Sequence, residues 1–195
     1  MEEYEYDVKI PKERVAIIIG TDGKTKDEIE AATGTTLDID SKEGDVKIKG
    51  DEPIALFSTR EIVKAIGRGF NPDIGMLLLK VDFLFDVVNI MEFAKTKNDL
   101  VRLRGRVIGQ EGKSRRMIEE LSECNISVFG KTVGIIGRAD YVPVARKAVE
   151  SLLSGSPHSN VYKYLEKQRR EMKKAEVEGE DFIKDEFKKD QKELD

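Results

Sequence analysis

One pattern occurs twice along this chain of 195 residues, and it limits the folds that the chain can adopt. Gly20 and Gly23 lie 89 positions before Gly109 and Gly112, and a lysine follows each pair. The same spacing of 89 joins Lys24, Ile29, Leu37 and Ile39 to Lys113, Ile118, Ile126 and Val128. After a loop that is shorter by two in the second copy, a spacing of 87 joins Val46, Ile48, Gly50, Ile62 and Ile66 to Val133, Ile135, Gly137, Val149 and Leu153. Such a repeat predicts two copies of one structural unit.

Each copy has the order strand, helix, glycine turn, helix, strand, strand, helix. From Tyr4 to Ile10, apolar residues alternate with charged ones, which is typical of a half-buried strand. The helices predicted in the first copy span 12–19, 24–32 and 53–66, and its hairpin pairs 37–39 with 46–48. In the second copy the first strand, residues 83–90, is almost continuously apolar. We therefore expect that strand to be buried on both faces.

The repeat and the local composition also predict the boundaries. We expect a first unit at 1–70, a helical bridge at 71–82, a second unit at 83–156, a basic helix at 157–175 and an acidic tail at 176–195. The bridge is leucine-rich and contains no Gly/Ser-rich linker, so we expect the units to pack through residues 71–85. The tail, expected to be mobile or bound to a partner, carries Phe182, Ile183 and Phe187 as a small apolar site.

The charge of the whole chain does not indicate nucleic-acid binding, because the formal net charge is -4. A local basic patch does surround the second glycine turn, where Glu111 is the one acidic residue between positions 100 and 116. The basic residues of this stretch are Arg102, Arg104, Arg106, Lys113, Arg115 and Arg116. The unpaired amides that open the following helix also favour an anion. The second turn is therefore a candidate phosphate-binding site.

The motif I-G-x-x-G between two short helices resembles the KH domain of the eukaryotic type. This resemblance implies an α+β fold with two tandem type I KH domains, each a three-stranded antiparallel sheet covered by three helices, plus a C-terminal helix. Two adjacent KH units followed by residues 155–162 and a basic helix are similar to the archaeal KH-domain pre-rRNA-processing proteins. Those proteins are relatives of the eukaryotic small-subunit assembly factor called partner of Nob.

In a KH domain the G-x-x-G turn clamps the backbone of single-stranded RNA. The resemblance therefore implies a factor for small-subunit ribosome assembly or pre-rRNA processing that binds rRNA mainly through the second unit. The residues expected to bind RNA are Arg102, Arg104, Arg106, Ile108, Gly109, Gln110, Glu111, Gly112, Lys113, Arg115 and Arg116. Weaker candidates in the first turn are Gly20, Thr21, Asp22, Gly23 and Lys24, because nearby acids offset the positive charges there. His158, a lone histidine in the first turn of the C-terminal helix, is a further weak candidate. We also expect other assembly factors, such as a processing endonuclease, as partners of a monomer.

An apolar floor for the bases is expected beside the second turn. Its candidate residues are Val107, Ile108, Ile118, Ile126 and Val128. Arg104 falls within the apolar arc of its helix. Its guanidinium either extends to the rim or reaches into the groove toward a base, and the sequence leaves both alternatives open.

An enzyme is not expected, because no nucleophile, phosphate loop or carboxylate cluster has a supporting spacing. We therefore expect no catalytic residue, no metal and no cofactor. The lone Cys124 permits no internal disulfide, and no apolar run approaches the roughly 18 residues that a membrane span needs. These features favour a cytoplasmic protein without a membrane partner. The alternative function is a protein-interaction scaffold whose KH units have weak or no RNA affinity.

Overall fold

The computed structural model describes residues 4–193, with side chains described through Glu178. The first unit comprises β1 (Tyr4–Lys9), α1 (Lys12–Ile19), η1 (Thr21–Gly23), α2 (Lys24–Thr33), β2 (Thr36–Ile39), β3 (Asp45–Gly50) and α3 (Pro53–Gly67). The bridge forms α4 (Pro72–Gly75) and η2 (Met76–Leu79). The second unit comprises β4 (Phe83–Asn89), η3 (Ile90–Glu92), α5 (Lys97–Ile108), η4 (Gln110–Gly112), α6 (Lys113–Ser122), β5 (Asn125–Phe129), β6 (Thr132–Arg138) and α7 (Val142–Leu153). A long helix, α8 (His158–Glu193), follows.

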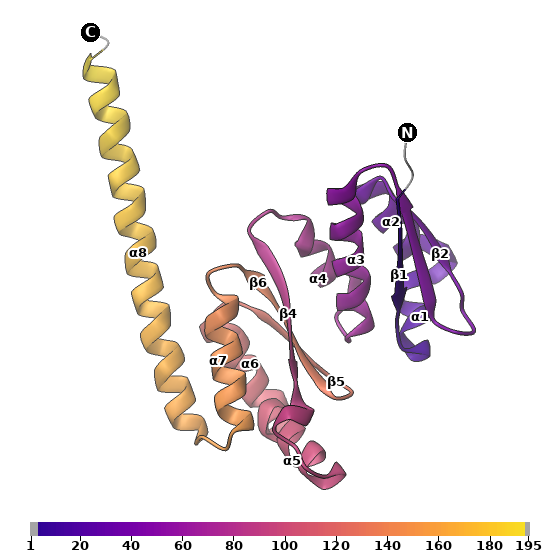
Figure 1. Cartoon of the computed structure of the whole chain (residues 1–195). Coiled ribbons are helices and arrows are strands. Elements are labelled where there is room, and N and C mark those ends of the chain that lie inside the picture. Colours follow the sequence, from indigo (N-terminus) through magenta and orange to yellow (C-terminus); the bar gives the residue numbers. More distant parts are fainter. Residues whose placement is uncertain (1–3, 194–195) are drawn as a thin grey trace.

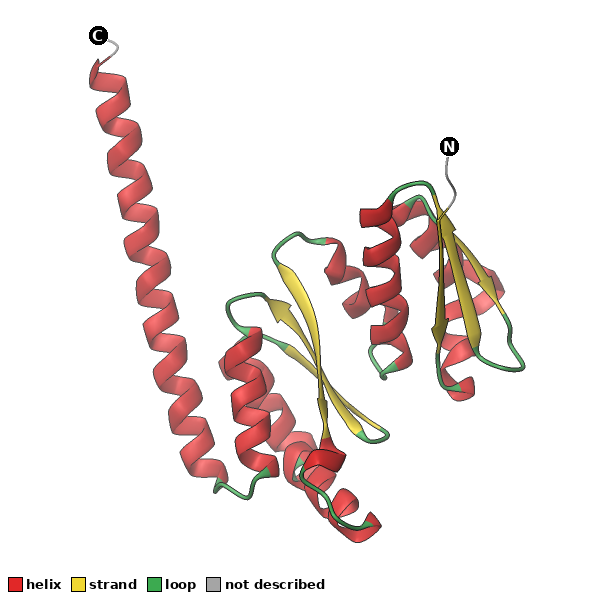
Figure 2. Ribbon diagram, viewed as in Figure 1, coloured by secondary structure: helices red, strands yellow, loops and turns green. Residues whose placement is uncertain are grey.

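Both units contain a three-stranded antiparallel sheet in which the last strand of the unit is central. The strand orders are β1-β3-β2 and β4-β6-β5. The registers match as well, because Val8 faces Val46 in the first sheet and Val88 faces Val133 in the second. The α+β fold with two repeated units is therefore confirmed, and Figure 2 shows the two sheets with their helices.

Local sequence signals account for the elements that position the second turn. Helix α5 starts at a capping box, in which the Asp99 amide donates to Thr96 Oγ1 at 3.1 Å and the Thr96 amide donates to Asp99 Oδ2 at 3.2 Å. The buried Leu103 and Val107 then follow one turn apart on its inner face. Helix α6 packs its buried Ile118 and Leu121 into the same core. The turn between these helices is thus held at both ends.

The sheet of the second unit is covered on both faces. Helices α5, α6 and α7 cover one face, and α3 and α4 of the neighbouring unit and bridge lie against the other (Figure 1). Ile136 on β6 is fully buried in the core of the first unit, where Phe83 and Phe85 also pack. The expectation that the units pack together is confirmed. Burial of the first strand on both faces is not, because Val88 is the one fully buried residue of β4 and Leu84 is exposed.

The two copies differ on the face that this packing covers. In the first sheet that face carries Glu5 and Asp7 on β1 and Lys47 and Lys49 on β3. The register places Phe85, Val87, Gly134 and Ile136 at the equivalent positions of the second sheet. Charged residues suit the first face because it lies in solvent, whereas apolar residues suit a face that is buried. This difference explains why only the second sheet is also covered on the face that points away from its own helices.

Helix α8 packs its buried Val161 and Leu165 against the second unit, and its C-terminal part projects from the rest of the molecule (Figure 1). The sequence placed a boundary between a basic helix and an acidic tail at position 176, but the helix continues across it to Glu193. The apolar site expected at Phe182, Ile183 and Phe187 lies outside the residues whose side chains are described. Within residues 4–193, no helix is long and apolar enough to cross a membrane.

Candidate RNA-binding interface

The second glycine turn has a backbone that only particular residues tolerate. Gly109, Glu111 and Gly112 all have positive φ, at 73°, 50° and 77°. A Cβ on Gly109 would lie 2.6 Å from the Cβ of Ser114 and 2.7 Å from its amide nitrogen, so this glycine is required by packing. A Cβ on Gly112 would meet nothing closer than Nη1 of Arg116 at 3.2 Å. The second glycine therefore lies beside the end of one flexible side chain and no backbone atom, so a phosphate can approach it.

The first glycine turn has the same backbone conformation. Gly20, Asp22 and Gly23 have φ values of 75°, 54° and 83°. The hydrogen bond that joins the helix after each turn to the edge strand is also repeated. The Leu37 amide donates to Glu30 Oε1 at 2.6 Å in the first copy, as the Ile126 amide donates to Glu119 Oε1 at 2.9 Å in the second. Any functional difference between the turns must therefore arise from their side chains.

The side chain beside the second glycine has opposite charge in the two copies. In the second copy this side chain is Arg116, whose Nη1 would lie 3.2 Å from a Cβ on Gly112. In the first copy it is Asp27, whose Oδ2 would lie 3.9 Å from a Cβ on Gly23. Asp27 and Arg116 are equivalent residues, 89 positions apart. The first lysine differs too, because Lys24 lies 3.7 Å from Glu28, whereas Lys113 is exposed and forms no ion pair within the described part of the chain. The charged group nearest the second glycine is thus positive in the second turn and negative in the first.

The structure separates Arg106 and His158 from this turn. Arg106 donates from Nε to the Leu152 carbonyl at 3.0 Å and from Nη2 to the Ser156 carbonyl at 2.6 Å. Nε2 of His158 lies 2.9 Å from the Arg106 carbonyl oxygen. These contacts join α5 to the connection between α7 and α8. The sequence could not indicate them, because the partners lie 46 to 52 residues apart.

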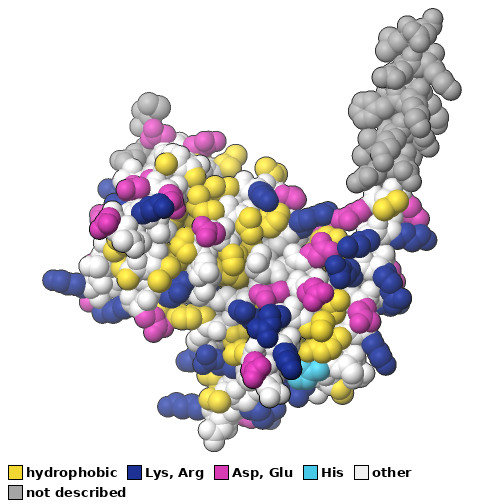
Figure 3. All heavy atoms as spheres, turned by 180° about the vertical axis from the view of Figure 1, so that it is seen from behind, with side chains coloured by type: hydrophobic (Ala, Val, Ile, Leu, Met, Phe, Trp, Pro, Cys, Tyr) yellow, Lys and Arg dark blue, Asp and Glu magenta, His cyan; other side chains and the backbone are white. Residues whose placement is uncertain are grey.

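Other predicted residues lie at or near the turn. Gln110, Glu111 and Lys113 are exposed, and Arg115 extends beside α6 with its Nε 3.8 Å from Glu119. On α5, Arg102 pairs with Asp99 at 3.3 Å. The Nε of Arg104 is buried and has no hydrogen-bond partner among the described residues. Positive charge is therefore local, and Figure 3 shows basic and acidic side chains interspersed over the face in view.

The floor expected for the bases is smaller than the sequence indicated. Val107 and Ile118 have no exposed surface and Ile126 is 2% exposed, so these three side chains belong to the core. Ile108 and Val128 are half-buried and remain available for contact. Alternating apolar residues indicate which side of an element faces inward, but they do not indicate how deeply each side chain is covered.

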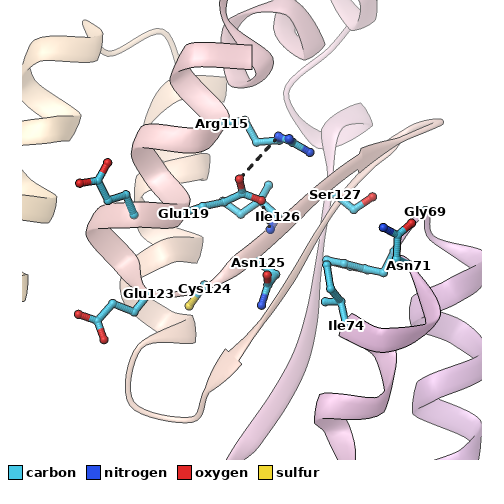
Figure 4. A pocket seen from close by; sticks show the side chains of 12 residues that line it. Gly69, Asn71, Ile74, Arg115, Glu119, Glu123, Cys124, Asn125, Ile126 and Ser127 are labelled. Carbon is cyan, nitrogen blue, oxygen red and sulfur yellow. Dashed lines mark hydrogen bonds and ion pairs between the residues drawn. The ribbon is translucent and has the colours of Figure 1, made fainter. Parts of the chain in front are cut away.

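A cavity of about 630 Å³ lies between the second unit and the bridge (Figure 4). One wall comes from α6 and β5, and its polar side chains are Arg115, Glu119, Glu120, Glu123, Asn125 and Ser127. The other wall is formed by Gly69, Phe70, Asn71 and Ile74. The sequence did not indicate these bridge residues as part of a site, because only the packing of the two units brings them to β5. Among the residues described, no group of three or more His, Cys, Asp or Glu side chains could hold a metal ion.

Comparison with known proteins places both units in one superfamily. Residues 84–170 match a family model described as the eukaryotic type KH domain (KH domain type I), and residues 5–68 match the KH domain. A KH domain-containing protein of Methanocaldococcus jannaschii is 46% identical over 175 residues, which cover 88% of this chain and 77% of that protein. The pre-rRNA-processing protein pno1 of Aspergillus fumigatus is 34% identical over 124 residues. That match covers 61% of this chain, which spans about half (48%) of the fungal protein.

Solved structures of similar proteins agree with this assignment. Dim2p from Pyrococcus horikoshii OT3 is 44% identical with a TM-score of 0.80, and the match covers 84% of this chain and 99% of Dim2p. The aDim2p chain in a complex of a/eIF2alpha, aDim2p and rRNA from the same organism is 43% identical with a TM-score of 0.82, over 87% of this chain and 96% of that one. The chain therefore belongs to the KH-domain family, as a protein with two KH domains that is homologous to archaeal KH proteins and to the eukaryotic Pno1 pre-rRNA-processing proteins.

Proposed function

We propose that this chain binds single-stranded rRNA of the small ribosomal subunit mainly through its second KH domain, as a factor for subunit assembly or pre-rRNA processing. Relatives support the class of ligand, since one is solved in a complex with rRNA and others are named pre-rRNA-processing proteins. The observation that carries the choice of domain is the charge reversal between Asp27 and Arg116 beside otherwise matching turns.

The geometry supports a specific division of roles. The RNA backbone approaches Gly112, where no Cβ intervenes, and the backbone amides that open α6 donate hydrogen bonds to a phosphate. Lys113, Arg115 and Arg116 neutralise phosphates, and the half-buried Ile108 contacts a base. Of the other predicted residues, Gly109, Gln110 and Glu111 shape the turn. Arg102 and Arg104 flank it on α5. Arg106 and His158 position α5 instead, because Nε and Nη2 of Arg106 and Nε2 of His158 are already bonded to the protein.

The first KH domain has an architectural role in this proposal. Its turn, formed by Gly20, Thr21, Asp22, Gly23 and Lys24, has the required backbone but carries the Asp27 carboxylate where the second domain has a cation. Its α3 and the bridge cover the sheet of the second domain. Weak RNA affinity in the first domain follows from its charges, and rigid support of the second domain follows from the packing.

Partners and location are parts of the same proposal. We expect a monomeric cytoplasmic binding factor, without catalytic activity, that acts with other assembly factors such as a processing endonuclease. Since this chain spans about half the length of the eukaryotic relatives, which is 48% for the fungal pno1, their further activities are not transferred to it.

A matched pair of glycine variants tests the proposal. Gly112→Asp and Gly23→Asp place a carboxylate at equivalent turn positions. Both glycines have positive φ, and the atom nearest an added Cβ is in each case the end of a side chain, so backbone strain is similar in the two variants. We expect Gly112→Asp to abolish detectable binding of a short single-stranded RNA and Gly23→Asp to weaken it less than about threefold. Circular dichroism checks that both variants are folded.

The pair also separates the proposal from the scaffold alternative. Equal loss of binding in both variants would show that the first domain contributes as much as the second. If the unaltered chain shows no salt-sensitive RNA binding, the KH units act as a protein scaffold instead.

A further inference from the structure

We propose that the cavity between the two KH domains is a nucleobase subsite in which Asn71 and Asn125 recognise adenine or cytosine. This inference rests on the proposed function, because it assigns a base contact to RNA held at the second turn. It adds Asn71, from the segment that joins the two domains, to the RNA-binding surface of the second domain. The surface that contacts bases is then formed by both parts.

One basic residue, Arg115, links the cavity to the proposed phosphate site. Arg115, the third residue of α6, belongs to the basic set beside the turn and also lines the cavity. A nucleotide whose phosphate lies near Gly112 can therefore place its own base, or that of its neighbour, in the cavity. The volume of about 630 Å³ lies within the range of roughly 300–1,000 Å³ typical of small-molecule sites.

The wall contributed by the bridge is held against the edge strand. Ser127 Oγ on β5 donates to the Arg68 carbonyl at 3.0 Å. Gly69, with φ of 99°, approaches so closely that a Cβ there would lie 2.6 Å from Ser127 Oγ and 3.0 Å from Phe129 Cβ. The approach needs a glycine, which makes this wall a fixed part of the structure.

The first domain has no such wall. Thr36 and Asp38 on β2 are equivalent to Asn125 and Ser127, and both are exposed. The groove between helix and edge strand therefore has a second wall only in the second domain. That domain is the one with the basic turn.

Two of the polar side chains that line the cavity are amides without a partner. Asn71 and Asn125 come from opposite walls (Figure 4), and neither side chain has a hydrogen-bond partner within the part of the chain that the structure describes. The backbone carbonyl of Asn71 accepts from the amides of Ile74 and Gly75, which fixes the residue at the start of α4. The backbone of Asn71 is therefore fixed, while its exposed side chain and the half-buried side chain of Asn125 keep their donors and acceptors free.

The donors and acceptors fit a base with an amino group next to a ring nitrogen. A side-chain amide donates one hydrogen bond and accepts another, which matches the N6 and N7 edge of adenine and the N4 and N3 edge of cytosine. Glu119 and Glu120 at the same cavity are acceptors that favour an exocyclic amino group and disfavour a carbonyl oxygen. An amide can also pair with the N3–H and a carbonyl oxygen of uracil. The preference against uracil therefore rests on the two carboxylates, which repel its carbonyl oxygens.

The test compares labelled hexauridylate with hexamers in which one uridine, at each position in turn, is replaced by adenosine or cytidine. We expect the full chain to bind at least one substituted hexamer about fivefold or more tighter than hexauridylate. Asn71→Ala and Asn125→Ala should each reduce that ratio below about twofold while affinity for hexauridylate stays nearly constant. Gly69→Ala, which displaces the bridge without removing a polar group, should also reduce it. Asn98→Ala, at an exposed site on α5, is the matched control and should leave the ratio unchanged.

Each outcome has a distinct meaning. An unchanged ratio in Asn71→Ala, or no preference over hexauridylate at any position, would overturn the subsite. Loss of all binding in Gly112→Asp together with an unchanged ratio in Asn71→Ala would overturn the subsite alone. Binding that survives Gly112→Asp would instead contradict the proposed function.

Discussion

The guanidinium of Arg138, at the end of β6, donates to Oε1 of Glu176 on α8 at 2.6 Å. The Tyr141 hydroxyl donates to the same oxygen at 3.2 Å. The hydrogen bond to Glu176 also raises the pKa of Arg138 above its usual value. These contacts tie α8 to the second domain well beyond Leu165, its last fully buried residue. The position at which composition turns acidic is therefore still attached to the domain.

Truncation at two neighbouring positions tests this attachment. A chain that ends at Ala175 should lose about 1 kcal/mol of unfolding free energy, mostly from the hydrogen bond to the buried Tyr141, because solvent screens the half-exposed ion pair. A chain that ends at Glu178 should keep its stability, and its RNA affinity should be equal or slightly higher once acidic residues are removed. Urea denaturation measures both. Equal stability of the two chains would show that Glu176 contributes nothing.

The hydroxyl of Tyr141 should make stability depend on alkaline pH. Burial first, and then the hydrogen bond to Glu176, raise its pKa from 10.0 to about 12. The folded protein holds this proton more tightly than the unfolded chain does, so the contribution is complete below pH 10 and is lost as the pH rises toward 12. Tyr141→Phe should flatten the dependence of unfolding free energy on pH in that window. An unaltered dependence in the variant would assign it to other groups.

Residues close in sequence predicted much of this structure. The repeat, the alternation on the strands and the I-G-x-x-G motif predicted the fold of each unit through the resemblance to the KH domain. The basic stretch beside Gly109 and Gly112 predicted only a phosphate site. What they could not supply depends on long-range contacts. Arg106 looks like its neighbour Arg104 in the sequence, and only the placement of α7 turns it toward the Leu152 carbonyl.

The packing of the two domains was more predictable than the cavity between them. Replacement of Lys49 by Ile136 at equivalent positions is a signal that one sheet face is buried, and it can be found by aligning the two copies strand by strand. The closeness of Gly69 to Ser127 has no such signal. It depends on the orientation of one domain on the other, which no spacing within a unit encodes.

Two arginine variants should separate phosphate binding from structural support. Arg116→Ala should flatten the slope of log affinity against log salt by about 0.7, since one phosphate contact with single-stranded RNA is lost. Arg106→Ala should leave the slope unchanged and lower the unfolding free energy by about 1–3 kcal/mol, because two carbonyls lose their donor. A flattened slope in Arg106→Ala would return this residue to the RNA-binding set.

Cys124 should be unreactive in the folded protein. Its side chain is 3% exposed, and burial raises the pKa of the thiol to about 12, so almost no thiolate forms near neutral pH. We expect slow modification by a thiol-specific reagent at pH 8 and rapid modification after unfolding in guanidinium. Rapid modification of the folded chain would show that the wall of the cavity beside Cys124 opens readily.

Gly134 and Phe70 test whether the domains are held by shape. A Cβ on Gly134 of β6 would lie 2.7 Å from Cε2 of Phe70, whose ring packs edge-on against Phe85 with centroids 6.0 Å apart. Gly134→Ala should therefore destabilise the chain by about 1–3 kcal/mol through overpacking. Gly105→Ala is the control, because nothing lies within 4 Å of that position in α5, and it should stabilise the chain by about 0.5–1 kcal/mol.

A double-mutant cycle identifies the ring as the obstacle. Phe70→Leu shortens the side chain that meets Gly134, so Gly134→Ala should cost clearly less in that background than in the unaltered chain. NMR relaxation gives an independent measure, since domains locked by this contact should tumble as one body and those separated by Gly134→Ala should not. An equal cost of Gly134→Ala in both backgrounds would show that Phe70 is not what the alanine meets. Independent tumbling of the unaltered domains would contradict a rigid wall for the cavity at Asn71.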